Sequence, residues 1–128
     1  MQGAVVSALR EIRWDREQVD RFLGRFLSEP KPHIVFDPPP APVSLRDFTS
    51  RVTANGVALD LRTQLLYDAR NVYLNGEVAD VPPDARALVE RLADKRSLSA
   101  RALVAAPAAL FRLLHGWYRD GFIEPPAR

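Results

Sequence analysis

The chain has 128 residues, 47% of them hydrophobic and 27% charged, which is enough to bury a core and too apolar for a disordered tail. Its net charge of +2 comes with no evident basic cluster, and the lack of cysteine excludes disulfides, cysteine zinc sites and thiol catalysis. No apolar run approaches the ~20 residues of a membrane span, and residues 1–6 do not resemble a signal peptide. We therefore expect a cytoplasmic protein with no membrane partner.

Two short amphipathic helices are predicted before a proline-rich stretch that runs from Pro30 to Pro42. Residues 4–13 form the first helix, and the second begins at Arg16 behind Asp15, a plausible N-cap. Their apolar stripe consists of Val5, Leu9, Ile12, Trp14, Val19, Phe22, Leu23, Phe26 and Leu27. Helices this short are not stable alone in water, so this stripe must be covered. We predict that it forms the interface of a homodimer, with folding back onto its own domain as the alternative.

The chain after the linker predicts helices around short strands. Ser44 caps a helix that Asn55-Gly56 ends, and Val57, Leu59 and Leu61 alternate as a strand. Further strands are expected at 64–67 and 71–74, and further helices from Pro82, from Ser97 to Ala105 and over 107–119, before a strand stub at 122–123. The pattern predicts an α+β fold: a helical segment with its proline-rich linker (1–40), then a winged-helix-like domain (41–128) with a small antiparallel sheet.

Catalytic and metal-binding patterns are missing from this sequence. His33 and Asp37 lie in a proline-bounded extended segment, and His115 stands in a helix between Leu114 and Gly116, where a helix-surface or a packed histidine is the expected role. Serines sit where helices start, and neither a nucleophile elbow nor a phosphate-binding glycine loop occurs. We assign no catalytic, cofactor-binding or metal-binding residue.

Nucleic-acid binding is the alternative function, because helices with strands suggest a helix-turn-helix. The reading face of helix 107–119 would hold only Arg112, His115 and Arg119. The remaining residues are apolar, so Phe111 and Trp117 are expected to be buried. The basic residues of 86–101 alternate with acidic ones, which is typical of a solvated mixed-charge surface. We therefore expect that nucleic acid is not a partner, and a stand-alone winged-helix nucleic-acid binder remains the alternative.

Several short stretches, in order along nearly the whole chain, resemble one known family. They are residues 22–39 (FLGRFLSEPKPHIVFDPP), 56–60 (GVALD), 66–68 (LYD), 72–77 (VYLNGE) and 117–123 (WYRDGFI). They are similar to the region after the catalytic barrel of the cupin-like JmjC oxygenases, the ribosomal-protein hydroxylases that include bacterial arginine hydroxylases. That family combines a barrel that binds Fe(II) and 2-oxoglutarate, helices that form a homodimer, and a C-terminal winged helix.

The resemblance implies that this chain is the non-catalytic C-terminal dimerisation and winged-helix module of such an enzyme. The family's iron motif, His-x-Asp, does not occur in this sequence. Fe(II) and 2-oxoglutarate would therefore belong to a barrel outside this chain, which would itself have no cofactor and no enzymatic activity. The implied partners are a second copy and, through the full-length enzyme, a ribosomal protein as substrate.

Overall fold

The structure, a computed structural model, describes residues 16–30 and 34–125. Its helices are α2 (Arg16–Ser28), α3 (Leu45–Asn55), the 3-10 turn η1 (Pro83–Ala85), α4 (Arg86–Lys95), α5 (Ala100–Leu103) and α6 (Ala108–Arg119). Its strands are β1 (Val57–Leu59), β2 (Leu65–Tyr67), β3 (Val72–Leu74), β4 (Glu77–Ala79), β5 (Ser97–Leu98) and β6 (Ile123–Glu124). The predicted α+β class is confirmed.

The strands form two antiparallel sheets of three strands each. In the first, β1 lies between β5 and β6, with Val57 opposite Leu98 and Leu59 opposite Ile123. In the second, β2, β3 and β4 follow one another as a meander centred on β3. The first sheet therefore ties together segments far apart in the chain, and the second is a local unit.

Local signals in the sequence set the ends of several elements. The hydroxyl of Ser44 accepts a hydrogen bond from the Asp47 N–H at 3.2 Å, which satisfies one free donor at the start of α3. Gly56 ends the same helix with a φ of 84°, a conformation that favours glycine. Asn75 and Gly76 both have positive φ values in the tight turn between β3 and β4. The predicted cap at Ser44 and the predicted helix end at Gly56 are confirmed.

The core lies between the helices α3 to α6 and the two sheets. Phe48 and Val52 of α3 are fully buried, and the ring of Phe48 stacks on Tyr118 of α6 with centroids 5.0 Å apart. Leu110, Leu114 and Trp117 line the inner side of α6. Trp117 is buried as expected, whereas Phe111 is only partly buried and packs at the edge of the core.

Three details of the sequence prediction were wrong. Leu61 is not in a strand, because Asp60 accepts hydrogen bonds from the Arg62 N–H and, through its backbone oxygen, from the Thr63 N–H. These bonds close a turn that leaves Leu61 92% exposed. Ser97 does not start a helix: it belongs to β5, and Ser99 caps α5 instead. The strand β4 was not predicted, since its residues show no apolar alternation.

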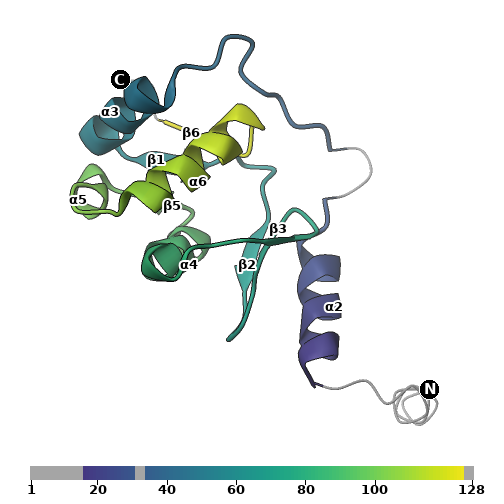
Figure 1. Cartoon of the computed structure of the whole chain (residues 1–128). Helices are drawn as coiled ribbons and strands as arrows, with labels where there is room; N and C mark the ends of the chain where they lie inside the picture. The colour runs from purple at the N-terminus through teal and green to yellow at the C-terminus, as the bar shows by residue number, and fades with distance from the viewer. Residues whose placement is uncertain (1–15, 31–33, 126–128) are drawn as a thin grey trace, which may run out of the picture.

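Helix α2 stands apart from the other helices, beside the β2–β3 hairpin, and a long connection leads from it to α3 (Figure 1). It touches all three strands of the second sheet. Within residues 16–30 and 34–125, none of the helices is long and apolar enough to cross a membrane.

Candidate interaction surface

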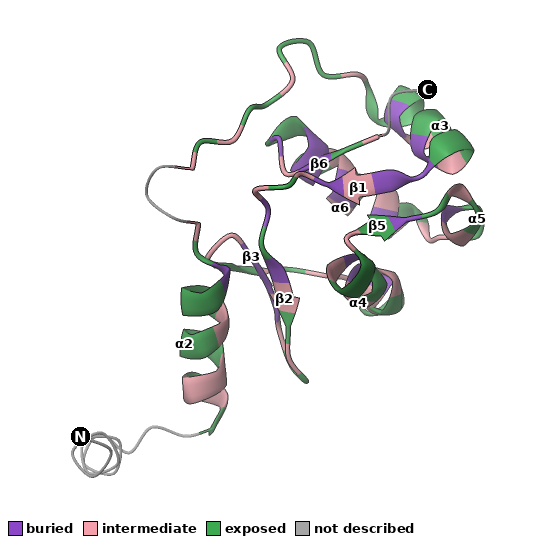
Figure 2. Cartoon of the chain, turned by 180° about the vertical axis from the view of Figure 1, so that it is seen from behind, coloured by how far each residue is buried: buried purple, intermediate pink, exposed green. Residues whose placement is uncertain are grey.

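Helix α2 turns most of its large apolar side chains towards solvent. We define its apolar face as Val19, Phe22, Leu23, Phe26 and Leu27. The exposed fractions are 52% for Phe22, 45% for Leu23, 63% for Phe26 and 62% for Leu27, and Val19 is partly buried. The rings of Phe22 and Phe26 stack with centroids 6.1 Å apart. The exposed side of α2 faces away from the second sheet (Figure 2).

The opposite side of α2, which we call its docking face, is small and polar. Gly24 lies directly against the ring of Tyr73, and a Cβ atom at this position would clash with that ring. One turn further on, Ser28 is fully buried, and its hydroxyl accepts a hydrogen bond from the Gly76 N–H at 2.9 Å. The helix backbone thus approaches the second sheet closely because neither residue has a large side chain.

Tyr73 is the centre of this contact. It is 1% exposed, and its hydroxyl donates to Asp68 Oδ2 at 2.6 Å and lies 3.3 Å from the backbone oxygen of Asp20 in α2. Burial, together with the carboxylate of Asp68, raises the pKa of Tyr73 to about 12. Burial would also raise the pKa of Asp68, but hydrogen bonds from Tyr73, Asn71 and Arg70 outweigh it and hold that pKa below its usual range.

Two weaker contacts lie at the edges of the docking face. Arg70 pairs with Glu17 at 2.9 Å, and Arg25 Nε donates to the backbone oxygen of Gly76 at 3.4 Å. Both arginines are exposed, so each contact adds little to stability. The position of α2 therefore depends mainly on the close approach of Gly24 and the buried hydrogen bonds of Ser28 and Tyr73.

We call residues 34–43, which precede α3, the strap. Its N-terminal end is bound to the core through aromatic and cationic groups. The ring of Phe36 packs edge-on against Phe122 with centroids 4.9 Å apart, and the guanidinium of Arg62 lies over the same ring. Arg62 also donates to the backbone oxygen of Val35 at 2.6 Å. Its hydrogen bond to Asp60 lowers the pKa of that carboxyl group.

The second end of the strap is bound through Val43. Its N–H donates to the Tyr118 hydroxyl at 3.0 Å, and its carbonyl oxygen lies 2.8 Å from His115 Nε2. The two partners are neighbours on α6, and both rings pack near Phe48. His115 is thus a packed histidine, one of the two roles that the sequence left open, and the strap is bound to the core near both of its ends.

The structure places five of the nine residues predicted to form the dimer interface, and they share one side of α2. The other four, Val5, Leu9, Ile12 and Trp14, lie outside the described residues. The alternative prediction was that the stripe folds back on its own domain. In α2, however, most of the stripe is exposed. This helix does pack on the second sheet, but through the docking face.

Sequence reasoning missed the docking face itself. Asp20, Gly24 and Ser28 follow one another at four-residue spacing, so they lie along one side of the helix. Small residues at that spacing are a sign of close backbone approach, but their partner, Tyr73, lies far along the chain.

The sequence model of the ROXA-like winged helix matches residues 11–124. The chain belongs to this family. Its fold also resembles three structures of YcfD from Escherichia coli, described as a ribosomal oxygenase. One has a TM-score of 0.76 and 21% identity, covering 96% of this chain and 33% of that chain. The others, one of them in complex with cobalt and 2-oxoglutarate, have TM-scores of 0.74 at the same identity and cover 34% of YcfD. No curated protein matches.

This ROXA-like winged helix therefore spans about a third of the length of the oxygenase structures that it resembles, and it matches their C-terminal part. The resemblance to the ribosomal oxygenase family and the winged-helix fold that it implied are confirmed. At 21% identity, the structural likeness establishes the fold and not the activity.

The described residues of this winged helix do not form the facial triad that binds Fe(II) in non-haem oxygenases. A facial triad takes two histidines and one carboxylate. His115 is engaged with the backbone of Val43, and His33 lies outside the described residues. Across residues 16–30 and 34–125, no three His, Cys, Asp or Glu side chains gather closely enough to hold a metal ion.

Helix α6 packs its apolar side into the core and lacks the features of a helix that reads bases. Its inner side is buried, and in its central and last turns Arg112, Gly116 and Arg119 are exposed beside the packed His115. A helix that reads the major groove needs an exposed row of hydrogen-bonding side chains. Sequence-specific reading through α6 is therefore unsupported by its geometry.

Proposed function

We propose that this chain is the assembly module of a ribosomal oxygenase and that two copies associate through the apolar face of α2. The observation that carries this proposal is the orientation of α2. Its small and polar side is bound to the second sheet, and four of its large apolar side chains are 45–63% exposed.

The docking of α2 supports a preformed interface. Because Gly24 and Ser28 hold the helix against Tyr73 and Gly76, the apolar face has a set direction before any partner binds. A preorganised surface loses less conformational entropy on association than a loose helix would. A two-fold axis is the commonest symmetry of homo-oligomers, and it would bring the same face of both copies together.

The energetics are consistent with a dimer. Fully burying a large apolar side chain contributes ~1.5–3 kcal/mol, and the half-exposed side chains of two copies together approach the ~4–15 kcal/mol that association costs. Val5, Leu9, Ile12 and Trp14, predicted on the same stripe, would add to this interface.

In this proposal the chain itself performs no catalysis. Fe(II) and 2-oxoglutarate would be bound by a catalytic barrel outside this chain, and the substrate of the whole enzyme would be a ribosomal protein. The winged helix would help to shape the cleft for that protein. A ribosomal-protein substrate would place the assembly in the cytoplasm.

The test is the molar mass of the chain by light scattering at high micromolar concentration. The wild type should be a dimer, and the double variant Phe26→Asp/Leu27→Asp should be a folded monomer by circular dichroism. The matched control is Leu61→Asp/Val104→Asp, which places two charges at exposed apolar positions away from α2. This control should remain a dimer.

Two results would contradict the proposal. A wild-type monomer at these concentrations would mean that the apolar face of α2 covers the barrel of the enzyme and not a second copy. Loss of the dimer in the Leu61→Asp/Val104→Asp control would place the interface away from α2.

A further inference from the structure

Charge is unevenly distributed along the winged helix. The segments 44–55 and 86–121, which contain helices α3 to α6, hold nine basic and four acidic residues. Residues 56–85, which contain the second sheet, hold two basic and five acidic residues. The helical part of the domain is thus clearly positive although the whole chain is nearly neutral.

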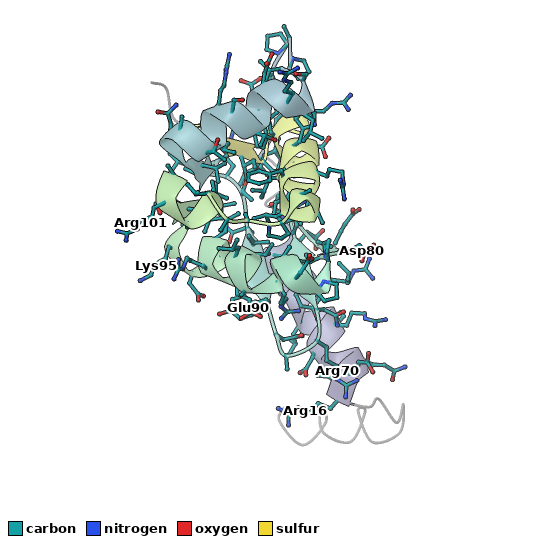
Figure 3. All side chains as sticks on the ribbon, turned by 60° about the vertical axis from the view of Figure 1, so that its left-hand side comes forward. Arg16, Arg70, Asp80, Glu90, Lys95 and Arg101 are labelled. Atoms are coloured by element: carbon teal, nitrogen blue, oxygen red, sulfur yellow. The ribbon has the colours of Figure 1, made fainter. Side chains whose placement is uncertain are left out.

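Most of these cations have no partner within the chain. In the described residues, seven exposed side chains of α3 to α6 take part in no ion pair and no hydrogen bond. They are Arg46, Arg51, Arg91, Lys95, Arg101, Arg112 and Arg119. We call these seven side chains the free cations. Arg101 and Lys95 project from the same side of the domain (Figure 3).

The acidic residues among them are largely engaged elsewhere. Glu90 pairs with Arg86 at 2.6 Å, and the carboxylate of Asp94 accepts the Tyr67 hydroxyl at 2.9 Å. Asp47 lies in the first turn of α3, and Asp120 ends α6. The sequence suggested a mixed-charge surface because acidic residues alternate with basic ones. The structure shows that two of those acids are occupied by groups other than the free cations.

Helix α6 adds a second, independent feature. Arg112, Gly116 and Arg119 lie on its solvent side within one narrow strip, since residues three and four apart share a helix face. A Cβ atom at Gly116 would meet nothing within 4 Å, so the fold itself has no need of a glycine there. Glycine in a helix is destabilising relative to alanine. A partner whose backbone approaches α6 closely would account for this residue.

From these observations we propose that the free cations of α3 to α6 bind the phosphate backbone of duplex RNA. Six of the seven are arginine, whose planar guanidinium matches a phosphate with paired hydrogen bonds. Helix α3 contacts both α5 and α6, so cations from three helices belong to one packed unit. Several separated cations without a central cavity fit an extended polyanion better than a small anion.

A protein is a less suitable partner for helices α3 to α6 than a polyanion. Interfaces between proteins depend on a few buried aromatic or apolar anchors. Among the described residues, the large exposed apolar side chains of these helices and their caps are Leu45 and Val104. The attraction this surface can offer is therefore electrostatic.

The choice of RNA over DNA rests on two points. Proteins recognise an RNA duplex mainly by its backbone and shape, because its deep major groove is too narrow for side chains to read. Because the apolar side of α6 is buried in the core, this helix can contact a phosphate backbone but offers few side chains for reading bases. The second point rests on the proposed function, since an enzyme that modifies a ribosomal protein works beside RNA.

The experiment is a fluorescence-anisotropy titration of the chain against a labelled RNA duplex of about two helical turns, from about 50 to 200 mM salt. Binding with a dissociation constant of about 10⁻⁴ to 10⁻⁶ M and a steep salt dependence is expected. Arg112→Gln/Arg119→Gln should weaken binding about tenfold at low salt and reduce the salt slope by about two. Arg46→Gln/Arg51→Gln should do the same.

The matched control is Arg16→Gln/Arg21→Gln, which removes two charges from α2 and should leave the affinity and the salt slope unchanged. Gly116→Gln should weaken binding several-fold without changing the salt slope, because it blocks close approach and removes no charge.

Three outcomes would overturn the inference. They are no binding at low salt, an equal loss in the Arg16→Gln/Arg21→Gln control, and equal affinity for a DNA duplex of the same sequence. The first two would refute binding through the free cations, and the third would refute RNA as their specific ligand. None of them depends on whether the chain is a dimer, so failure of the assembly proposal would be seen separately by light scattering.

Discussion

Helix α2 and helix α6 are both amphipathic, but they are attached to the domain in opposite ways. Helix α6 buries its apolar side, with Leu110, Leu114 and Trp117 in the core. Helix α2 binds through a glycine, a serine and polar backbone groups, and leaves phenylalanine and leucine in solvent. Burial of its own large apolar side chains therefore fixes the position of α6, whereas α2 is positioned with most of its large apolar side chains exposed.

The two helices also depart differently from the usual arrangement. An amphipathic helix in a self-contained domain normally turns its apolar stripe to the core. Helix α2 does the reverse, and the assembly proposed above would account for its outward apolar face. The following changes should separate the two kinds of attachment, starting with the core.

Trp117→Ala should have the largest effect. Trp117 is 7% exposed in the core, so truncation should lower the free energy of unfolding by about 3–5 kcal/mol. Urea unfolding followed by circular dichroism measures this loss. Val104→Ala, at an exposed position after α5, should change stability by less than about 0.5 kcal/mol. A loss below about 1 kcal/mol for Trp117→Ala would mean that α6 is not anchored in the core.

Gly24→Ala should loosen α2 and leave the core intact. The new methyl group would meet the ring of Tyr73, and relieving that overlap should cost about 1–3 kcal/mol of local stability. Amide hydrogen exchange should become faster in α2 and stay unchanged in α6. In a Tyr73→Ala background the effect of Gly24→Ala should disappear, because the ring that it meets is gone. Unchanged exchange in α2 would refute the close contact.

Asp68→Asn should have a smaller, pH-dependent effect on the same contact. The folded pKa of Asp68 is below its usual range, so its carboxylate stabilises the folded chain at pH above ~4, and this contribution is lost as pH falls. The variant should be less stable by about 1–2 kcal/mol at neutral pH, since it loses a hydrogen bond to a charged group.

The difference between wild type and Asp68→Asn should shrink as the pH falls below ~4, and urea midpoints at pH 7 and pH 3 measure it. Asp60→Asn is the comparison, since the pKa of Asp60 is also lowered, first by its hydrogen bond with Arg62 at the strap. It should show a similar pH dependence but speed exchange of the Arg62 amide, whose N–H donates to Asp60, and not of the amides of α2. A difference for Asp68→Asn that persists at pH 3 would contradict a role for its charge.

The sequence was informative where the signal is local. Ser44 predicted the start of α3, and the apolar spacing in residues 16–27 predicted an amphipathic helix, because caps and helical periodicity involve residues within one or two turns. Strand β4 gave no such signal, since it forms only by pairing with β3.

The orientation of α2 could not be read from its own residues. Periodicity shows which residues share a side, but not which side meets the domain. Here that depends on Gly24 fitting against Tyr73, a residue of a different element. The same holds for the charges of α4, since only the structure shows that Asp94 is engaged by Tyr67.

The smallest effect expected is a gain in stability, and it compares the same substitution on the two helices. Gly116→Ala on α6 should stabilise the isolated chain by about 0.5–1 kcal/mol, because alanine loses less backbone entropy than glycine in a helix. Unlike Gly24, Gly116 has nothing within 4 Å of a new Cβ atom. Amide exchange of α2 in Gly24→Ala should therefore show a loss of local stability, whereas urea unfolding of Gly116→Ala should show a gain. A destabilising Gly116→Ala would show that the fold itself requires this glycine, and it would remove the reason to assign it to a partner's close approach.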